Sequence, residues 1–235
     1  MRLTFVLILL CGLCHGQSLI NSYNFGAPST LSNGLQARLD FNGNTTDAQG
    51  NTVTQPNGTA VTFEASLNGQ AATFTGSQAL EFTDADLETE PYSVSIVFKT
   101  GTTGFQILSE LSRQVTTNHK GVNIFDGATA PVYMMVDDTN YQGIVNTSDG
   151  AWYHVIVTYD GTNYAAYVDD SATASISGTD ASNGLTGNGK VYIGGRPDNS
   201  SEFLTGAIDM VAWWDRALTA AEIAEEFSNY DSTND

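Results

Sequence analysis

The chain has few residues that could brace it covalently or bind a soft metal. Its 235 residues include two cysteines, Cys11 and Cys14, and three histidines, of which His119 and His154 lie beyond the first sixteen positions. Both cysteines fall within those sixteen positions, so the rest of the chain depends on its core, or on bound metal, in place of disulfides. Zinc and copper sites are not expected, because they need cysteine or closely paired histidine ligands.

Positive charge is equally scarce. Eight lysine and arginine residues stand against 26 aspartate and glutamate residues, which gives a formal net charge of −18. Nucleic acids and anionic membranes present phosphates that need basic partners, so this composition argues against both. It is compatible with bound cations, with neutral ligands and with a solvated acidic surface in saline surroundings. Charge alone does not decide among these.

Long apolar runs are also missing, apart from one at the N-terminus. Residues 3–13 are almost wholly apolar, follow Arg2 and precede Cys14-His15-Gly16. The run is shorter than the roughly 20 residues of a membrane-spanning helix, and its layout is that of a secretory signal peptide. We therefore expect residues 1–16 to be cleaved near Gly16, the protein to be secreted, and no segment to insert into a membrane.

What the chain does contain is a series of short segments with β-strand patterning. Glycine is frequent, and serine, threonine and asparagine fill the gaps between apolar runs, as in proteins with many turns. Residues 92–99 alternate cleanly and predict a half-buried strand, and Asp160-Gly161 predicts a hairpin turn. Further strands are predicted at 152–159, 164–168, 191–194 and 208–214, with weaker ones at 35–41, 71–74, 105–111, 121–125 and 132–136.

One helix is predicted, near the C-terminal end. Thr219 and Glu222 have the spacing of a capping box, and Ile223 and Phe227 fall on one face. These elements predict an all-β protein: a two-sheet antiparallel sandwich with one short C-terminal helix, formed as a single domain by residues 34–230. Residues 17–33 are expected to be a lead segment or an edge strand, and residues 231–235 a frayed tail.

Five pieces of the sequence, in order, resemble a known family. They are residues 35–47, residues 69–76, residues 92–98, the Trp-Tyr-His-Val and Tyr-Val-Asp motifs within residues 149–169, and residues 191–227 with their Gly-Ala-Ile-Asp and Arg-Ala-Leu-Thr motifs. This order is similar to that of laminin-G-like jelly-roll domains in the concanavalin-A-like lectin/glucanase superfamily, and it implies a jelly roll. Asp170 stands where the family usually turns with glycine. We expect this turn to form, because aspartate also adopts turn conformations.

Calcium is the cofactor that the sequence suggests. Asn42, Asn44 and Asp47 place three oxygen donors in one glycine-containing loop, and oxygen ligands are what Ca²⁺ requires. The resemblance adds Asp209, because many relatives hold a structural ion between this loop and the Gly-x-Ile-Asp piece. The alternative is that these side chains bond only their own backbone, as asparagine and aspartate do in turns.

A ligand-binding site is predicted from aromatic residues that lie among polar ones. Tyr133, Tyr141 and Trp214 are the aromatic candidates, and Tyr141 lies in a polar segment with Asp138 and Asn140. Binding pockets combine apolar and aromatic surface with a few hydrogen-bonding groups, so these residues predict a glycan site. The alternative is that each ring only packs against its neighbours. For Trp213 we expect a place in the core.

No catalytic pattern is evident in the sequence. Asp84, Asp86, Glu88 and Glu90 alternate, but Pro91 follows and apolar residues are few, which favours a loop over the carboxylate-bearing strand of a glycosidase. The glucanase and lyase motifs of the superfamily are missing, as are a Gly-x-Ser-x-Gly elbow and a Cys–His pair. We therefore predict a protein that is not an enzyme.

The predicted function is that of a secreted, non-catalytic recognition module that binds a glycan or an extracellular protein and is stabilised by calcium. The alternative is a structural subunit of a matrix, sheath, filament or virion surface, built from copies of this chain. A polysaccharide lyase or hydrolase is the third hypothesis. Four sequons would be glycosylated in a eukaryotic host: Asn44, Asn57, Asn146 and Asn199. A glycan on Asn44 would conflict with its role as a calcium ligand.

Overall fold

The computed structural model describes residues 29–88, 90–100, 104–112, 120–124, 131–137, 140–147, 150–180, 189–196 and 202–231. The predicted signal peptide, most of the predicted lead segment, Asp138, Asn199 and the last four residues lie outside this set. Within the described part of the chain, no helix is long and apolar enough to span a membrane.

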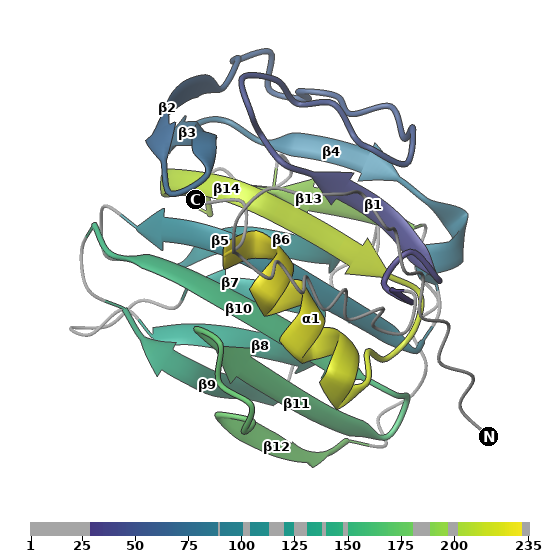
Figure 1. The fold of residues 1–235 in the computed structure, drawn as a ribbon. Helices are drawn as coiled ribbons and strands as arrows, with labels where there is room; N and C mark the ends of the chain where they lie inside the picture. Colours follow the sequence, from purple (N-terminus) through teal and green to yellow (C-terminus); the bar gives the residue numbers. More distant parts are fainter. Residues whose placement is uncertain are drawn as a thin grey trace, which may run out of the picture.

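The described strands form two antiparallel sheets that pack face to face (Figure 1). The larger sheet runs in the order β12 (Ile176–Thr179), β11 (Asn163–Val168), β10 (Trp152–Tyr159), β5 (Tyr92–Thr100), β14 (Thr205–Trp214), β3 (Gly69–Thr75), β2 (Thr62–Ser66), and β1 (Leu35–Leu39) also pairs with β14. The smaller sheet runs β4 (Leu80–Thr83), β13 (Lys190–Ile193), β6 (Gln106–Ser112), β7 (Lys120–Ile124), β8 (Pro131–Asp137), β9 (Asn140–Asn146). The predicted all-β, two-sheet antiparallel fold is confirmed.

The main hydrophobic core lies between the two sheets. The alternating residues Tyr92, Val94, Ile96 and Phe98 of β5 all point into it and are fully buried. Trp213 of β14 belongs to the same core, as predicted, and its indole N–H donates to the Ser109 hydroxyl of the opposite sheet at 2.8 Å. This bond satisfies a polar group that would otherwise be buried without a partner.

The outer face of β5 is covered as well, so the prediction of a half-buried strand is wrong. Ser93, Ser95 and Val97 point away from the core, yet each is at most 1 % exposed. Helix α1 (Ala220–Asp231) lies across this outer face of the larger sheet (Figure 1). Its apolar residues, including Ile223 and Phe227, form a second hydrophobic cluster with the sheet. Alternation with a period of two predicts the strand, but it cannot predict that a helix covers the polar face of that strand.

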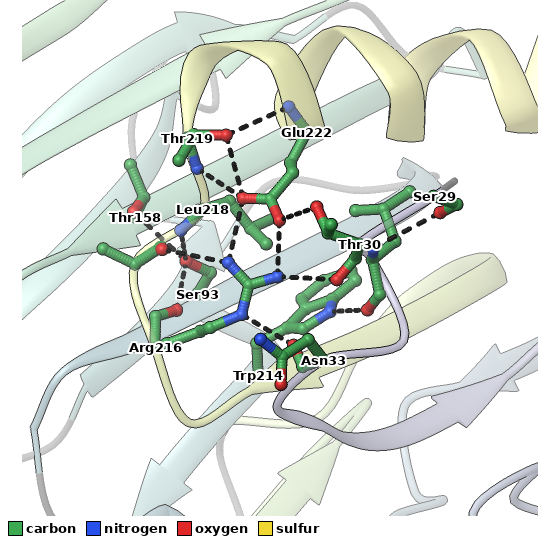
Figure 2. Close-up of polar contacts among 12 residues, drawn as sticks. Ser29, Thr30, Asn33, Ser93, Thr158, Trp214, Arg216, Leu218, Thr219 and Glu222 are labelled. Carbon is green, nitrogen blue, oxygen red and sulfur yellow. Dashed lines mark hydrogen bonds and ion pairs between the residues drawn. The ribbon is translucent and has the colours of Figure 1, made fainter. Parts of the chain in front are cut away.

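The N-terminal end of α1 is fixed by a set of polar contacts (Figure 2). Thr219 caps the helix: its backbone N–H donates to Glu222 Oε2 at 2.9 Å, and its hydroxyl accepts the backbone N–H of Glu222 at 3.4 Å. This confirms the predicted capping box. The Arg216 guanidinium donates to both Glu222 oxygens, at 2.9 and 2.7 Å. The guanidinium lowers the pKa of Glu222 well below its usual range.

The described part of the predicted lead segment is not a strand but is packed against this helix. The Thr30 hydroxyl donates to Glu222 at 2.5 Å, and the Leu31 carbonyl accepts the Trp214 indole N–H at 2.7 Å (Figure 2). Leu31 is 7 % exposed and belongs to the second hydrophobic cluster. Residues 29–34 therefore belong to the folded unit, which begins slightly before the N-terminal boundary that we expected at residue 34.

Strand β14 changes partner partway along its length. Its first half, Thr205–Ile208, pairs with β3, and its second half, Val211–Trp214, pairs with β1. The register shifts between Ile208 and Met210, which places Asp209 at the bulge between the two halves. Bulges redirect side chains out of the regular alternation. Here the redirected Asp209 carboxylate bonds the Ser66 hydroxyl and the Tyr230 hydroxyl.

Four strands of the structure were missed from the sequence: β2, β4, β9 and β12. Each lies at or next to the edge of a sheet. Strand β2, with the sequence Thr-Phe-Glu-Ala-Ser, alternates polar and apolar residues, but it has only five residues and none of them is fully buried. Such strands are recognised by their pairing partners, which the local sequence does not reveal.

Candidate functional site

The described residues form a pocket at the C-terminal end of α1, on the outer face of the larger sheet. Its volume is about 200 Å³, and its wall comes from the start of β10, the turn after β11, the β2–β3 turn and the end of the helix. We call it the helix-end pocket; its wall includes Trp152, Tyr153, His154, Asp169, Asp170 and Tyr230. Aromatic rings and a few polar groups meet here, as in ligand-binding pockets generally.

A wider and more open hollow of about 470 Å³ lies near the other end of the helix, beside β12. The one carboxylate in its wall, Asp160, already accepts hydrogen bonds from the backbone of Thr162 and from the backbone and side chain of Asn163. These bonds, chiefly from Asn163, lower the pKa of Asp160. Since its carboxylate serves the β10–β11 turn, this hollow is the weaker candidate for a ligand site.

Two aspartates form one rim of the helix-end pocket. Asp169 and Asp170 have φ of 47° and 60°, and the Ser171 N–H donates to the Val168 carbonyl at 3.1 Å, which closes a type I′ turn. Aspartate tolerates this left-handed region better than most residues, so the turn expected without glycine does form. The turn is tied to the sheet, because Asp169 Oδ1 accepts the backbone N–H of His154 at 2.8 Å.

His154 lies at the base of the pocket and begins a buried hydrogen-bonded chain. It is 7 % exposed, and its ring packs edge-on against Phe227 and Tyr230 of the helix. Its Nε2 lies 2.8 Å from the Ser95 hydroxyl, and Ser95 in turn hydrogen-bonds the buried Glu226. Burial raises the pKa of Glu226, and the nearby Arg38 guanidinium opposes this rise.

The direction of these hydrogen bonds assigns the tautomer of His154. Arg38 donates to both Glu226 oxygens, at 3.0 and 3.2 Å, so the carboxylate accepts the Ser95 hydroxyl proton as well. Ser95 must then accept from the Nε2–H of His154, which leaves Nδ1 as an unprotonated acceptor. Burial, with a smaller contribution from the Arg38 charge, lowers the pKa of His154 to about 3, so the ring is neutral. Among the described residues, Nδ1 has no hydrogen-bond donor.

The helix side of the pocket is held by Tyr230. Its hydroxyl donates to Asp209 Oδ2, and Asp209 Oδ1 accepts from Ser66, which joins the helix, the β14 bulge and β2. Burial raises the pKa of Asp209, and the hydrogen bonds from Tyr230 and Ser66 oppose this. Because Tyr230, Asp209 and Ser66 hydrogen-bond to one another, they fix the position of this part of the pocket wall.

The opposite side of the pocket carries the partly buried ring of Trp152, while the ring of the neighbouring Tyr153 faces the core between the sheets. Tyr153 stacks on Phe98 with ring centroids 6.0 Å apart. Lys99 places its ammonium 5.2 Å from the centroid of the Trp152 ring, and the same ammonium pairs with Glu64 at 2.5 Å. Trp152 therefore already contacts one ammonium group through its π-system.

The arrangement is suited to binding. The Ser95 hydroxyl is fully buried beneath the pocket, so the Ser95–His154 pair does not present a nucleophile to a ligand. The groups that do line the pocket include aromatic residues, the neutral imidazole of His154 and two exposed aspartates. Such a wall can hold an apolar or ring-shaped face and accept hydrogen bonds from the ligand.

The structure places three of the predicted ligand-binding residues on two paired strands of the smaller sheet, and Trp214 on the larger sheet. Tyr133 lies on β8 of the smaller sheet, where it is partly buried and pairs with Asn123 and Gly143. Asn140 and Tyr141 begin the neighbouring β9, and Asp138 lies outside the described residues. This β8–β9 edge is on a different sheet from the helix-end pocket.

Trp214 is placed differently from the prediction. It lies on β14 of the larger sheet, is 0 % exposed, and belongs to the hydrophobic cluster beneath α1. Its face therefore packs against the helix and is not accessible to a sugar. Trp214 lies on the opposite face of β14 from Trp213, and nothing in the sequence indicated that a helix covers that face.

The predicted calcium donors divide into two groups. Both Asp47 oxygens accept backbone N–H groups, from Arg38 at 2.7 Å and Asn51 at 2.8 Å, and Asn44 Oδ1 accepts the backbone N–H of Thr46 at 2.8 Å. Asp209 bonds Ser66 and Tyr230, and no described hydrogen bond joins it to the other predicted ligands. The donors fit calcium in chemical type, while the bonds of Asp47 and Asn44 follow the turn alternative.

Two other observations concern metals and sequons. Within the described residues, no three acidic, histidine or cysteine side chains are grouped so as to hold a metal ion. Of the sequons, Asn44 and Asn146 are exposed, Asn57 donates its amide to the Ser77 carbonyl at 3.0 Å, and Asn199 lies outside the described residues. Use of these acceptors stays a prediction.

The helix-end pocket was missed by sequence reasoning. Trp152, His154 and Asp169 were noted only as parts of family motifs. No local signal connects them to Tyr230, because the helix reaches the pocket only after the chain has crossed both sheets several times. The one sequence hint was Asp170 in place of a turn glycine.

Comparison with protein families gives one match. A laminin G family model, described as the concanavalin A-like lectin/glucanases superfamily, matches residues 74–224, which is more than half of the chain. A comparison with the sequences of curated proteins gives no match.

Solved structures with the same fold are numerous, and three illustrate their range. Domain 4 of the extracellular GH43 arabinanase AbnA from Geobacillus stearothermophilus, in complex with arabinotriose, is 18% identical with a TM-score of 0.64, over 81% of this chain and 97% of that one. A Trypanosoma rangeli sialidase mutant with trans-sialidase activity is 17% identical, with a TM-score of 0.65, over 85% of this chain. The binding domain of Paraclostridial Mosquitocidal Protein 1 is 12% identical, with a TM-score of 0.64, over 84% of this chain.

These three likenesses establish the fold and no more, because the identities are low. This chain spans 33% of the length of the sialidase and 52% of that of the mosquitocidal binding domain. Fold alone does not fix function.

Proposed function

Because the chain belongs to the concanavalin A-like lectin/glucanase superfamily, we propose that it is a carbohydrate-recognition module and that its ligand occupies the helix-end pocket. The observation that carries this proposal is the wall of the pocket, where the partly buried Trp152 stands among the acceptors His154 Nδ1, Asp169 and Asp170. The complex of the arabinanase domain with arabinotriose supports a carbohydrate ligand in general.

The chemistry of the pocket matches that of a sugar. A sugar ring has an apolar face that can lie against an aromatic ring, and hydroxyl groups that donate hydrogen bonds. Trp152 would supply the ring, and the unprotonated Nδ1 of His154 and the carboxylate of Asp170 would accept from the hydroxyls. A pocket of about 200 Å³ has room for a single sugar unit at the end of a chain or as a branch.

The proposal extends to three properties that the sequence suggested. The module is secreted after loss of residues 1–16, it acts without catalysis, and calcium contributes to its stability. The buried position of Ser95 supports the second of these, and only the oxygen-donor chemistry of Asn42, Asn44 and Asp47 supports the third. Each is tested separately from ligand binding.

The test is a glycan array followed by calorimetric titration of the sugars that bind. Trp152→Ala should weaken binding about tenfold, because stacking on an aromatic ring is lost, whereas Trp152→Phe should keep most of it. Tyr133→Ala is the matched control on the other sheet and should leave the affinity unchanged. If Tyr133→Ala abolished binding while Trp152→Ala did not, the site would lie at the β8–β9 edge instead.

A further inference from the structure

We infer that the helix-end pocket selects a sugar that carries a free amino group, so that its preferred ligand is an amino sugar in its ammonium form. This inference rests on the proposed function, because it names the class of carbohydrate that the same pocket takes. It follows from the charges and the hydrogen-bonding roles of the groups in the wall.

The charged groups in the pocket wall are both carboxylates. Asp169 and Asp170 are exposed at the rim, and His154 is held neutral. Asp170 has no ion-pair or hydrogen-bond partner for its carboxylate among the described residues. The cations that act on the wall are already paired: the Lys99 ammonium beside Trp152 with Glu64 at 2.5 Å, and the Arg38 guanidinium with Glu226 at 3.0 Å. The Asp170 carboxylate is therefore an uncompensated negative charge at the pocket, which favours a cationic ligand.

The polar groups are matched to an ammonium group in number and kind. An ammonium has three N–H donors and no acceptor. The wall holds His154, whose Nδ1 is assigned as an acceptor by the Ser95–Glu226 hydrogen bonds, and the carboxylates of Asp169, which already accepts the His154 backbone N–H, and Asp170. A hydroxyl can donate only one hydrogen to these acceptors, so it uses less of the site than an ammonium does.

The aromatic side of the pocket has the same preference. The Trp152 ring already holds the Lys99 ammonium at 5.2 Å, which shows that its π-system is reachable by a cation in this fold. The same residue lines the pocket. A sugar that stacks on this ring can direct an amino substituent toward His154 and Asp170 at the same time.

The experiment compares three sugars that differ at one position: glucosamine, glucose and N-acetylglucosamine. The chain has three tryptophans, and Trp213 and Trp214 are fully buried. A change in tryptophan fluorescence on binding therefore reports on Trp152, at the pocket. At about pH 6, where an amine of this kind is charged, glucosamine should bind about tenfold more tightly than either neutral sugar. The preference should shrink as salt screens the exposed carboxylates.

Asp170→Asn is the decisive variant. Asparagine also adopts the left-handed conformation of this turn, so the fold should be kept while the charge is removed. The preference for glucosamine over glucose should fall to about threefold. Glucose should lose less affinity than glucosamine, because the asparagine amide oxygen still accepts a hydrogen bond from a hydroxyl. A preference that is undiminished in Asp170→Asn would overturn the inference.

The two proposals fail in different ways. If glucose and glucosamine bind equally, the amino-sugar inference is wrong and the carbohydrate site stands. If no sugar changes the Trp152 fluorescence, and none on the array binds in a Trp152-dependent way, both are wrong. If n-butylammonium, which has the amine but no ring, binds as tightly as glucosamine, the pocket recognises the ammonium alone and the sugar assignment falls.

Discussion

At the scale of single residues, His154 shows how burial changes an ionisable group. Its ring is 7 % exposed, and its pKa is lowered to about 3, first by burial and then by the Arg38 charge. In the unfolded chain the same ring titrates near its ordinary value of about 6.5. The native state therefore binds fewer protons than the unfolded state between these two values.

This difference predicts acid sensitivity above the range where carboxylates titrate. Stability should fall as the pH is lowered from about 6.5 toward 3, because His154 takes up a proton in the unfolded state and stays neutral in the native state. Urea unfolding at a series of pH values would measure it. His154→Gln keeps a neutral side chain at the same place, and its stability should depend less on pH between about 6.5 and 5. Equal slopes for the two proteins would contradict the prediction.

The buried hydrogen bond between Trp213 and Ser109 gives a second residue-scale prediction. Ser109→Ala leaves the indole N–H of Trp213 without its partner in the core, 2.8 Å away. The free energy of unfolding should fall by about 1–3 kcal/mol, the cost of a buried unsatisfied donor. Chemical denaturation measures this loss. Ser32→Ala, at an exposed position, should change it by no more than about 0.5 kcal/mol.

At the scale of elements, the fixing of α1 depends on one carboxylate. Glu222 is 6 % exposed and accepts hydrogen bonds from Arg216, Thr30 and Thr219 (Figure 2). The helix in turn covers Trp214 and the outer face of β5. The cap, the salt bridge and the N-terminal segment therefore act together on the same helix terminus.

Removal of this carboxylate should loosen the helix before the rest of the fold. Glu222→Ala should lower the free energy of unfolding by about 2 kcal/mol, since a cap and a partly buried ion pair are lost together. Native-state hydrogen exchange should show faster exchange in Ala220–Asp231 than in the core strands. Thr219→Ser keeps the cap and should leave exchange nearly unchanged. An equal increase of hydrogen exchange in α1 and in the strands of both sheets would contradict this prediction.

The carboxylate of Glu222 also predicts a pH effect with a defined sign. Its pKa is lowered in the folded protein, mainly by Arg216. Its contribution to stability is therefore complete above the ordinary glutamate pKa of about 4.3 and is lost as the pH falls below that value. In Glu222→Gln the acid unfolding transition below about pH 4 should be shallower than in the unmodified protein.

At the scale of the whole molecule, stability without disulfides raises the question of metal. If calcium is held by the predicted donors, a chelator should lower the melting temperature and added Ca²⁺ should restore it. Asp209→Ala should abolish that response if Asp209 is a ligand. If the variant is merely less stable and still responds to Ca²⁺, Asp209 is structural, in line with its bonds to Ser66 and Tyr230.

The oligomeric state distinguishes the two predicted functions, a recognition module and a structural subunit of an extracellular assembly. A recognition module should elute and scatter light as a single chain over a wide concentration range. A structural subunit of an extracellular assembly should associate with its own copies as concentration rises, and should give no signal on a glycan array. Self-association together with glycan binding through Trp152 would favour a lattice that binds carbohydrate.

The sequence by itself determined the elements that depend on neighbouring residues. Alternation over residues 92–99 and 152–159 predicted β5 and β10, and the spacing of Thr219 and Glu222 predicted the start of α1. These signals are local, because the strand period and the capping box involve residues only a few positions apart. The order of the motifs then predicted the sandwich.

Only the tertiary structure decided which faces of those elements are covered and where a pocket remains. The helix buries the polar side of β5 and the face of Trp214, and its end completes the pocket with His154 and Asp170. The contact from Thr30 to Glu222 joins residues 192 positions apart. Burial is a property of such distant contacts, and a single sequence carries no periodic signal for them.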